Sequence, residues 1–473
     1  MTSYNLTLIF SIFLWAIQVT AQPAGNILTA QAKQIITEKI GRLLEVNYID
    51  KEVGKTCADY LSKQQENGHY EQISHPREFA KQLNEELFKI HNDRHIRVQF
   101  IPPEGRDIEL QNPDLFFLLR TYERKKENYG FREVKIFAGN IGYLDLRLFE
   151  PIELVREKAL QAMHFLEDAD ALIIDLRKNS GGNPATVQFL CSWFFDQPVH
   201  LNTIHWRRGD YNEEFWTLDS IGLPKKPELP LLILTSSKTF SAAEEFAYTM
   251  QVQRRATLLG EITAGGANPG YRFSINDQFS IFIPTGRSTN PVTGTNWEGV
   301  GVKPDIAVSQ ANVLDIALER ALLTGRLYRE KQDDQRVGNF MELSNKLKEI
   351  SASIKKSQSA DSVSDLETIL DYQMRKGMIN EWVVNNLAYR YMSDNNPQLA
   401  LVLFKYNTTR FPSSANAWDS LGEVYDELGQ WESGIEAYQK ALLLDPGSQN
   451  ARMMLDKLKG KTGESKRNRQ DLK

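Results

Sequence analysis

Two segments of the chain repeat the same order of a buried strand, a tight turn and a helix. In residues 171–195 an apolar run meets a turn that contains Gly181 and Gly182, and a helical pattern follows. In residues 229–246 a second apolar run leads to Ser241, which stands where the next helical pattern opens. Strands that alternate with helices in this way pack into a sheet covered by helices. The sequence therefore predicts a mixed α/β domain here.

Ser241 has two interpretations. At the first turn of a helix its hydroxyl lies beside unpaired backbone N–H groups and the positive end of the helix dipole, where an attacking oxygen and a developing oxyanion are both favoured. The pair Ser241 and Glu244 also has the spacing of a capping box, in which the hydroxyl only satisfies helix N–H groups. From this stretch alone the capping role is favoured.

Two further features of the sequence indicate a catalytic or ligand-binding site, each more weakly than Ser241 does. Gly181 and Gly182 permit positive φ, so their N–H groups can point at a ligand, although glycine turns are common in α/β folds. The pair Asp93 and His95 follows a helical pattern and precedes an alternating, strand-like run. A histidine at such a junction can project into a cleft, but it is more often structural or exposed.

The remaining patterns divide the chain into domains. Apolar residues that recur every three or four positions predict a helical domain before the α/β domain. Near the C-terminus, Trp418, Gly422, Tyr425 and Tyr438 fit the tetratricopeptide pattern, with a second copy about 34 residues earlier. The predicted plan is a signal peptide at 1–21, a helical cap domain at 22–100, a linker at 101–130, the α/β domain at 131–327, a charged helical connector at 328–364, an all-α tetratricopeptide domain at 365–460 and a disordered tail at 461–473.

The N-terminus predicts export. An apolar run too short to span a bilayer comfortably is followed by small residues that end at Ala21, which is typical of a cleaved signal peptide. The usual Lys or Arg before the run is missing, so an uncleaved anchor stays open as an alternative. We expect a periplasmic or extracellular protein, with membrane contact only if that segment is retained.

Composition excludes several classes of function. The net charge of −5 argues against nucleic acid as a partner, because phosphate binding needs a concentrated basic face. Cys57 and Cys191 are isolated, and the seven histidines show no ligand spacing. No phosphate loop or dinucleotide turn is present in the sequence. The sequence therefore predicts no metal and no cofactor, and two unpaired thiols.

Five motifs in one order resemble a known superfamily. Together they are similar to the C-terminal processing serine peptidases, in the branch that contains the tricorn protease core and the interphotoreceptor retinoid-binding protein repeats. The resemblance implies a catalytic domain related to crotonase and the Clp peptidase. The motifs are Asp93-Arg-His95, Asp175 to Gly182, Thr239 to Glu245, Gly260 to Gly266 and Glu298 to Asp305, within about residues 28–327.

The resemblance implies roles for individual residues. Ser241 matches the nucleophile, and His95, supplied by the cap domain, matches the general base of the tricorn-like branch. The processing branch instead uses a lysine, whose place here is occupied by Gly266. A neutral imidazole suits a base at neutral pH better than an unperturbed lysine does.

The resemblance also implies how the reaction is supported. The N–H groups of Ala242 and of Gly181 or Gly182 match the oxyanion donors. Glu298 matches a glutamate that polarises the site through the residue before the histidine. That residue is Arg94 here, where tricorn has a serine, so a direct ion pair between Arg94 and Glu298 is one way to complete the relay.

Three functions follow as hypotheses. The first is a secreted or periplasmic serine peptidase that acts on peptides or exported proteins through a Ser–His acyl-enzyme. The second is a non-catalytic protein that binds a lipid, a retinoid-like molecule or a peptide, and the third is a tetratricopeptide scaffold with an inactive peptidase domain. The repeats are expected to offer a concave face to a protein partner.

Overall fold

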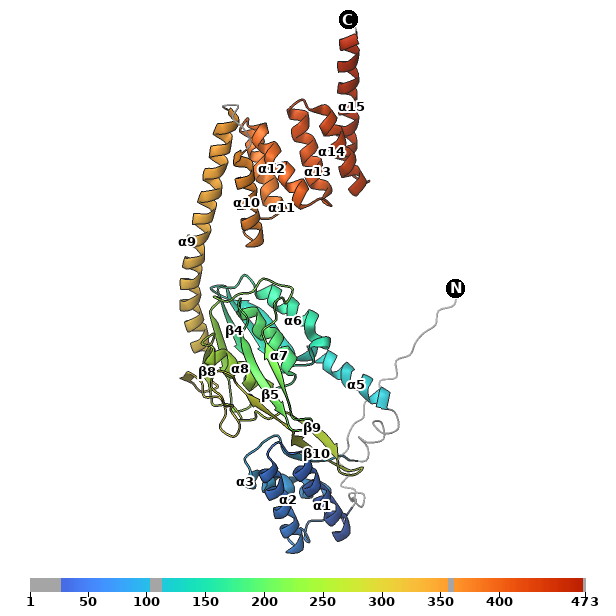
Figure 1. The fold of residues 1–473 in the computed structure, drawn as a ribbon, viewed down its shortest axis with the longest axis vertical. Helices are drawn as coiled ribbons and strands as arrows, with labels where there is room; N and C mark the ends of the chain where they lie inside the picture. Colours follow the sequence, from blue (N-terminus) through green and yellow to red (C-terminus); the bar gives the residue numbers. More distant parts are fainter. Residues whose placement is uncertain (1–26, 103–112, 356–360, 471–473) are drawn as a thin grey trace, which may run out of the picture. The chain divides into compact units, whose positions relative to one another are not determined.

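The computed structural model describes residues 27–102, 113–355 and 361–470. The chain divides into two compact units, Met1–Tyr328 and Arg329–Lys473, which are described separately below (Figure 1). The predicted signal peptide lies outside the described residues. Within the described ranges, every helix is too short or too polar to cross a bilayer.

The cap domain consists of three helices and one short strand, α1 (Ala30–Asn47), α2 (Lys51–Glu66), α3 (Pro76–Ile90) and β1 (Arg97–Phe100). Each helix begins at a residue whose side chain accepts a helix N–H, namely Thr29, Asp50 and His75. The apolar stripes of the helices meet in one core. The turn between α3 and β1 carries Asp93 and His95.

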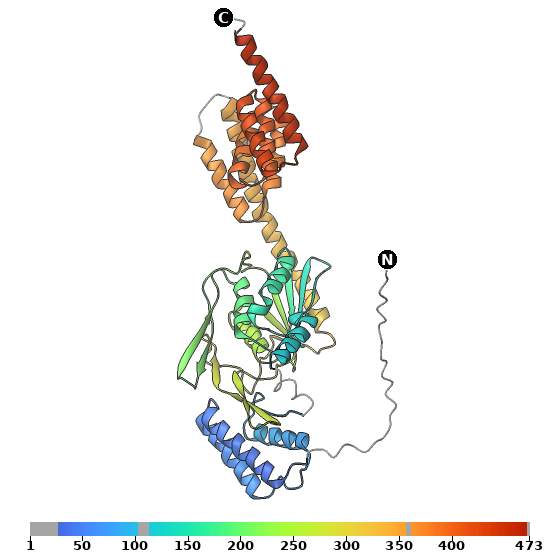
Figure 2. The same cartoon turned by 90° about the vertical axis from the view of Figure 1, so that its right-hand side faces the viewer.

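The cap domain shares its core with a ribbon from the larger domain. β1 pairs antiparallel with β10 (Phe279–Pro284), which pairs in turn with β9 (Gly270–Ser274). Alternate residues of β10, Phe279, Ile281 and Ile283, are buried among the cap helices. Both views show the blue helices gathered at the end of this yellow ribbon (Figures 1 and 2). The junction that carries His95 is thereby attached to the α/β domain.

The α/β domain contains a six-stranded sheet in the order β12-β8-β7-β4-β3-β2. Only β2 and β3 pair antiparallel, and the other neighbours are parallel. Their bounds are β2 (Phe131–Phe137), β3 (Ile141–Leu146), β4 (Ala171–Asp175), β7 (Leu231–Thr235), β8 (Thr257–Gly260) and β12 (Ile306–Ala307). The predicted mixed α/β fold is confirmed.

Helices cover both faces of this sheet, so β4 and β7 are buried along their whole length. On one face lie α6 (Ile152–Leu166), α7 (Pro184–Cys191) and α8 (Ala242–Val252). On the other lies the start of α9 (Val313–Lys355). Because β4 and β7 are parallel neighbours, the turns that follow them meet at one edge of the sheet, and this places the Gly181 turn beside Ser241.

The smaller elements complete the first unit. A second three-stranded sheet has the order β11-β5-β6, and helix α5 lies inside the predicted linker. Cys57 and Cys191 are free and buried, as predicted. The bounds are α5 (Pro113–Lys126), η1 (Asn128–Gly130), η2 (Ser192–Phe194), β5 (His200–Trp206), β6 (Tyr211–Trp216) and β11 (Gly286–Thr289).

The second unit is entirely helical in its described part. Its elements are the end of α9, α10 (Asp361–Arg375), α11 (Glu381–Ser393), α12 (Pro397–Arg410), α13 (Ala415–Glu427), α14 (Trp431–Leu444) and α15 (Gln449–Gln470). The pairs α11–α12 and α13–α14 correspond to the two predicted repeat copies. A Cβ added at Gly422 would lie 2.8 Å from the ring of Tyr438, so this repeat position requires glycine.

Two element boundaries differ from the sequence prediction. α9 is one helix that crosses the predicted boundary between the α/β domain and the charged helical connector, because no proline interrupts this stretch and pairs such as Asp333 with Arg336 support it. α15 continues to Gln470, so most of the predicted disordered tail is helical. Lys457 and Lys461, one turn apart, both pair with Asp426 and hold the helix beyond its apolar part.

Glu245 is a buried acid in the core of the first unit. Its side chain lies on α8 near Asn202 and Cys191, and burial raises its pKa to about 8. At pH values between the ordinary pKa of a glutamate and about 8, Glu245 in the folded protein therefore holds a proton that it has released in the unfolded chain. Such a group makes the free energy of unfolding fall as pH rises through this window.

We predict that Glu245→Gln removes this fall in the free energy of unfolding with rising pH. The difference in unfolding free energy between variant and wild type should grow in the variant's favour from pH 5 to pH 8, by at most about 1.4 kcal/mol per pH unit. Denaturant unfolding of the first unit at a series of pH values measures it, with the exposed Glu157→Gln as control. Parallel curves for Glu245→Gln and wild type would contradict the assignment.

Candidate active site

Ser241 occupies a strained corner between β7 and α8. It is the N-cap residue of α8, and its φ of 55° and ψ of −122° are unfavourable for a residue with a side chain. The Glu244 carboxylate accepts the Ser241 N–H at 2.8 Å, as one half of the predicted capping box requires. Ser241 also lines a cleft, so the capping role and a chemical role are compatible.

Glu244 connects the serine corner to the loop that follows β8. Its fully buried carboxylate also accepts the N–H groups of Gly265 and Gly266, at 2.6 and 2.9 Å, and the hydroxyl of Thr263. Burial raises the pKa of Glu244, and these donors oppose that rise. Because one carboxylate holds both segments, Ser241 and the loop at Gly266 are placed together.

The Gly181 turn lies directly against Ser241. A Cβ added at Gly181 would be 2.7 Å from the Cβ of Ser241, and Gly181 has a φ of 100° that favours glycine. The Gly181 N–H donates to the Asn179 side chain at 2.8 Å, so it is already engaged. Within the described residues the N–H groups of Gly182 and Ala242 have no partner. They are the better candidates for oxyanion donors.

His95 lines the same cleft as Ser241. Its ring is 8 % exposed and lies on Phe240, with centroids 4.4 Å apart, and near Phe282 at 6.0 Å. Burial lowers the pKa of His95, while Asp93 opposes this, so the imidazole is neutral at neutral pH. In the described part of the chain no hydrogen bond joins the His95 ring to the Ser241 hydroxyl.

Gly266 leaves no room for the lysine of the processing branch. A Cβ added there would lie 2.7 Å from Cε1 of His95 and would overlap the ring of Phe240. The two aromatic rings therefore fill the space where a longer side chain would begin. A base on this loop and a base at His95 exclude each other sterically.

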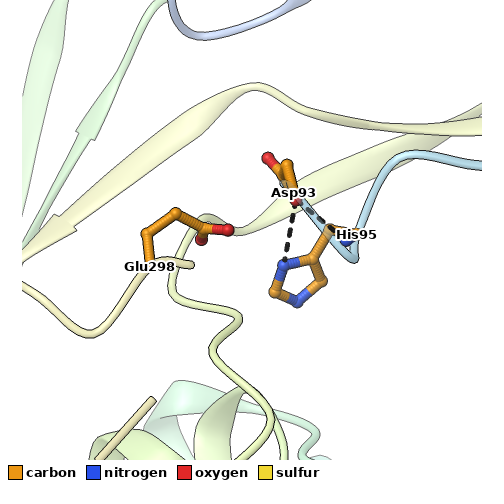
Figure 3. Close-up of side chains that lie close together, drawn as sticks. All are labelled: Asp93, His95 and Glu298. Carbon is orange, nitrogen blue, oxygen red and sulfur yellow. Dashed lines mark hydrogen bonds and ion pairs between the residues drawn. The ribbon is translucent and has the colours of Figure 1, made fainter. Parts of the chain in front are cut away.

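Asp93 is the carboxylate nearest to the histidine ring (Figure 3). Its Oδ1 accepts the backbone N–H of His95 at 2.8 Å and lies 3.8 Å from the ring nitrogen Nδ1 of the same residue. Its Oδ2 accepts the Tyr48 hydroxyl at 2.8 Å. The side chain is buried and held at both oxygens. The pair Asp93 and His95 is visible in the sequence, but no role for Asp93 was predicted from it, and no sequence pattern indicated Tyr48.

Glu298 approaches the same point from the other side. Its Oε2 accepts the N–H groups of Ala267 and Asn268 at 2.7 and 3.0 Å, whereas its buried Oε1 has no partner among the described residues. Burial, and then the charge of Asp93, raise the pKa of Glu298 to about 8. Asp93, His95 and Glu298 each offer an atom within 4.8 Å of the others.

Arg94 does not occupy the position that the relay would require. Its side chain is exposed, and its guanidinium carbon lies 5.8 Å from the centre of the Phe88 ring. Among the residues that the structure describes, no ion pair joins Arg94 to Glu298. Because neighbouring side chains on this turn point in different directions, Asp93, and not Arg94, faces His95 and Glu298.

The cleft itself has a volume of 730 Å³. Besides the catalytic candidates, its lining includes Trp206, Glu213 and Phe215 from the β5–β6 ribbon and Tyr271 of β9. A second cavity of 570 Å³ shares Trp206 and Tyr271. The site therefore continues into a surface with several aromatic side chains, and the two cavities together are large enough for several residues of a peptide.

Comparison with protein families is consistent with this geometry. Residues 140–308 match peptidase family S41, and residues 22–123 match the N-terminal domain of this peptidase in eukaryotic IRBP. Residues 415–448 match a tetratricopeptide repeat. The first match contains Ser241 and Glu298, and the second contains His95.

Curated relatives are named carboxy-terminal processing proteases. The one from Bartonella bacilliformis is 24 % identical over 42 % of this chain and 47 % of its own length. That from Synechocystis is 30 % identical over 36 % of this chain and 38 % of its own length. CtpB of Bacillus subtilis is 24 % identical over 49 % of this chain and 46 % of its own length. The chain thus spans less than half the length of each of these relatives.

Solved structures resemble the chain more distantly. A putative peptidase from Parabacteroides merdae has a TM-score of 0.43 at 17 % identity and covers 61 % of this chain and 96 % of its own. The tricorn protease has a TM-score of 0.40 at 12 % identity, with 62 % and 37 % covered. On the family matches, the chain carries a peptidase family S41 domain, preceded by the N-terminal domain of that family and followed by a tetratricopeptide repeat.

Proposed function

We propose that the protein is an exported serine peptidase that hydrolyses peptide bonds in peptides or in other exported proteins. The observation that carries this proposal is the single cleft that holds Ser241 at a strained helix N-terminus together with His95. Such a corner presents a hydroxyl to a substrate and keeps backbone N–H groups beside it.

The chemistry is acyl transfer. The Ser241 oxygen attacks the peptide carbonyl while His95 accepts the hydroxyl proton, and the ring then returns this proton to the leaving amine. A water molecule, deprotonated by His95, hydrolyses the resulting ester. The N–H groups of Gly182 and Ala242 stabilise the oxyanion, and each such donor is worth about 2.7–4 kcal/mol of barrier.

Asp93 takes the place of the predicted relay in this proposal. Its carboxylate is fixed by the Tyr48 hydroxyl and lies 3.8 Å from Nδ1 of His95, so a small rotation of the ring closes a hydrogen bond. Such a bond selects the tautomer in which Nε2 accepts a proton. Glu298 supports the site by holding the turn at Ala267 and Asn268.

A non-catalytic binding protein is the second candidate. Two observations favour it. Among the described residues no hydrogen bond joins the His95 ring to the Ser241 hydroxyl, and a cavity with several aromatic side chains lies beside the cleft. In either case the substrate or ligand is a peptide, a protein or an apolar molecule, and the tetratricopeptide helices offer a site for a protein partner. Export rests on the N-terminal sequence pattern.

Labelling with a fluorophosphonate distinguishes the two functions. We predict one adduct per mature chain by intact mass, none in Ser241→Ala, and labelling that is slower by about 100-fold or more in His95→Ala. Ser180→Ala, which alters another serine of the same cleft, should label like the wild type. A folded wild-type protein that does not react would support the binding function.

Gly266→Ala tests the position of the base. The added methyl group meets the rings of His95 and Phe240, and overpacking of this kind costs about 1–3 kcal/mol and displaces side chains. We predict a large loss of labelling rate with cooperative folding retained, as measured by thermal unfolding. Gly338→Ala, at a helical position with open space around it, is the control. Unchanged labelling would show that His95 is not the base.

Removal of the repeats tests the division into units. All residues assigned to the chemistry lie in the first unit. We therefore predict that deletion of the segment after Ala360 leaves hydrolysis of a short peptide within about twofold of the full chain, as expected for independent domains. Loss of short-peptide cleavage in a folded deletion variant would place the repeats within the catalytic architecture.

A further inference from the structure

Three side chains from distant parts of the sequence converge behind the cleft. Asp93, His95 and Glu298 each offer one atom within 4.8 Å of the others, although Glu298 is more than two hundred residues away in the chain (Figure 3). Asp93 is 1 % exposed and the His95 side chain 8 % exposed. This arrangement combines a nitrogen and two carboxylates in a largely water-excluded place.

Two atoms of this cluster lack partners. Within the described residues, neither Nδ1 of His95 nor Oε1 of Glu298 makes a hydrogen bond, and both are buried. Buried polar atoms are nearly always paired, because an unpaired one has lost its water without compensation. The nearest oxygen of Asp93 is 3.8 Å from Nδ1, which is too long for a hydrogen bond.

The unpaired atoms share one chemical property. A carboxylate that binds a metal is deprotonated, so Oε1 of Glu298 then only accepts, and an imidazole nitrogen without a proton also offers a lone pair. A ligand that satisfies all three side chains at once must therefore be an electron-pair acceptor. A metal cation accepts electron pairs from all three side chains at once, whereas the two protons of a water molecule serve only the two unpaired atoms, Nδ1 of His95 and Oε1 of Glu298.

We propose that Asp93, His95 and Glu298 bind a zinc ion. One imidazole nitrogen and two carboxylate oxygens form a set that zinc accepts, with a water molecule as the fourth ligand. Magnesium and calcium prefer shells made of oxygen alone, so the nitrogen disfavours them. Zinc bonds of about 2.0–2.2 Å require the three side chains to draw together on binding.

Zinc at this position blocks the proposed peptidase, and this part of the inference rests on the proposed function. A histidine that binds a metal through Nδ1 carries its proton on Nε2. Nε2 then donates a hydrogen bond and can no longer take the proton of Ser241. The cluster thus acts as an inhibitory site, in which Asp93, the carboxylate that orients His95 in the free enzyme, binds the metal together with Glu298 in the inhibited one.

Equilibrium dialysis and calorimetric titration of the untagged, full-length protein with zinc chloride test the site directly. One zinc ion per chain should bind to the wild type, and the stoichiometric site should disappear in His95→Gln and in Glu298→Gln. His164→Gln is the matched control, because His164 pairs with Glu167 on the surface and should bind zinc like the wild type. Absence of saturable binding to the wild type, or unchanged binding in His95→Gln, would overturn the inference.

Thermal unfolding guards against misfolded variants. A ligand that binds only the folded state raises its melting temperature, so zinc should raise that of the wild type. His95→Gln and Glu298→Gln should unfold cooperatively without zinc and show no rise with it. A rise equal to that of the wild type in either variant would refute the ligand assignment.

The Ser241→Ala variant separates this inference from the proposed function. It should bind zinc like the wild type, although it cannot react with a fluorophosphonate. If the wild type binds zinc but never labels, the site stands and the peptidase fails. If the wild type labels, but zinc neither binds nor slows labelling in a way that a chelator reverses, only the zinc site fails.

Discussion

The pairing of β1 with β10 is the contact on which the site depends. Four residues of the cap domain join a strand of the α/β domain nearly two hundred residues later in the chain, and three apolar side chains of that strand enter the cap core. The burial of these side chains, and the ladder hydrogen bonds beside them, make the attachment strong. Without it, the turn that carries His95 would have no defined position relative to Ser241.

A second constraint acts at the level of single atoms. The buried carboxylate of Glu244 accepts hydrogen bonds from the Ser241 N–H and from the loop at Gly265 and Gly266. The same loop leaves a space at Gly266 that the rings of Phe240 and His95 fill. Ser241, His95 and the loop at Gly266 are therefore parts of one packed unit. A change in the size of any of these side chains displaces the others.

Several features of the site could be predicted from local sequence because their causes are local. A serine after a buried strand, with a glutamate three residues later, identified both the capping box and the corner. The tetratricopeptide pattern and the mixed α/β sheet follow from periodicities in the chain. The direction of side chains and their hydrogen bonds could not be predicted in this way: Arg94 points outward and Asp93 inward, and the Gly181 N–H is engaged by Asn179, which leaves Gly182 of the two expected donors. The length of α9 was missed because a charged stretch can be either a linker or a helix.

The sequence alone determined the order of strands, turns and helices, the position of Ser241 at a helix start and the absence of a lysine at residue 266, because each depends on neighbours in the chain. Tertiary structure decided which side chains meet. Glu298 approaches Asp93 and His95, and Tyr48 holds Asp93, only because β1 and β10 pair and the cap core forms around them. Contacts between residues so far apart in the chain arise from packing, and no local pattern encodes packing.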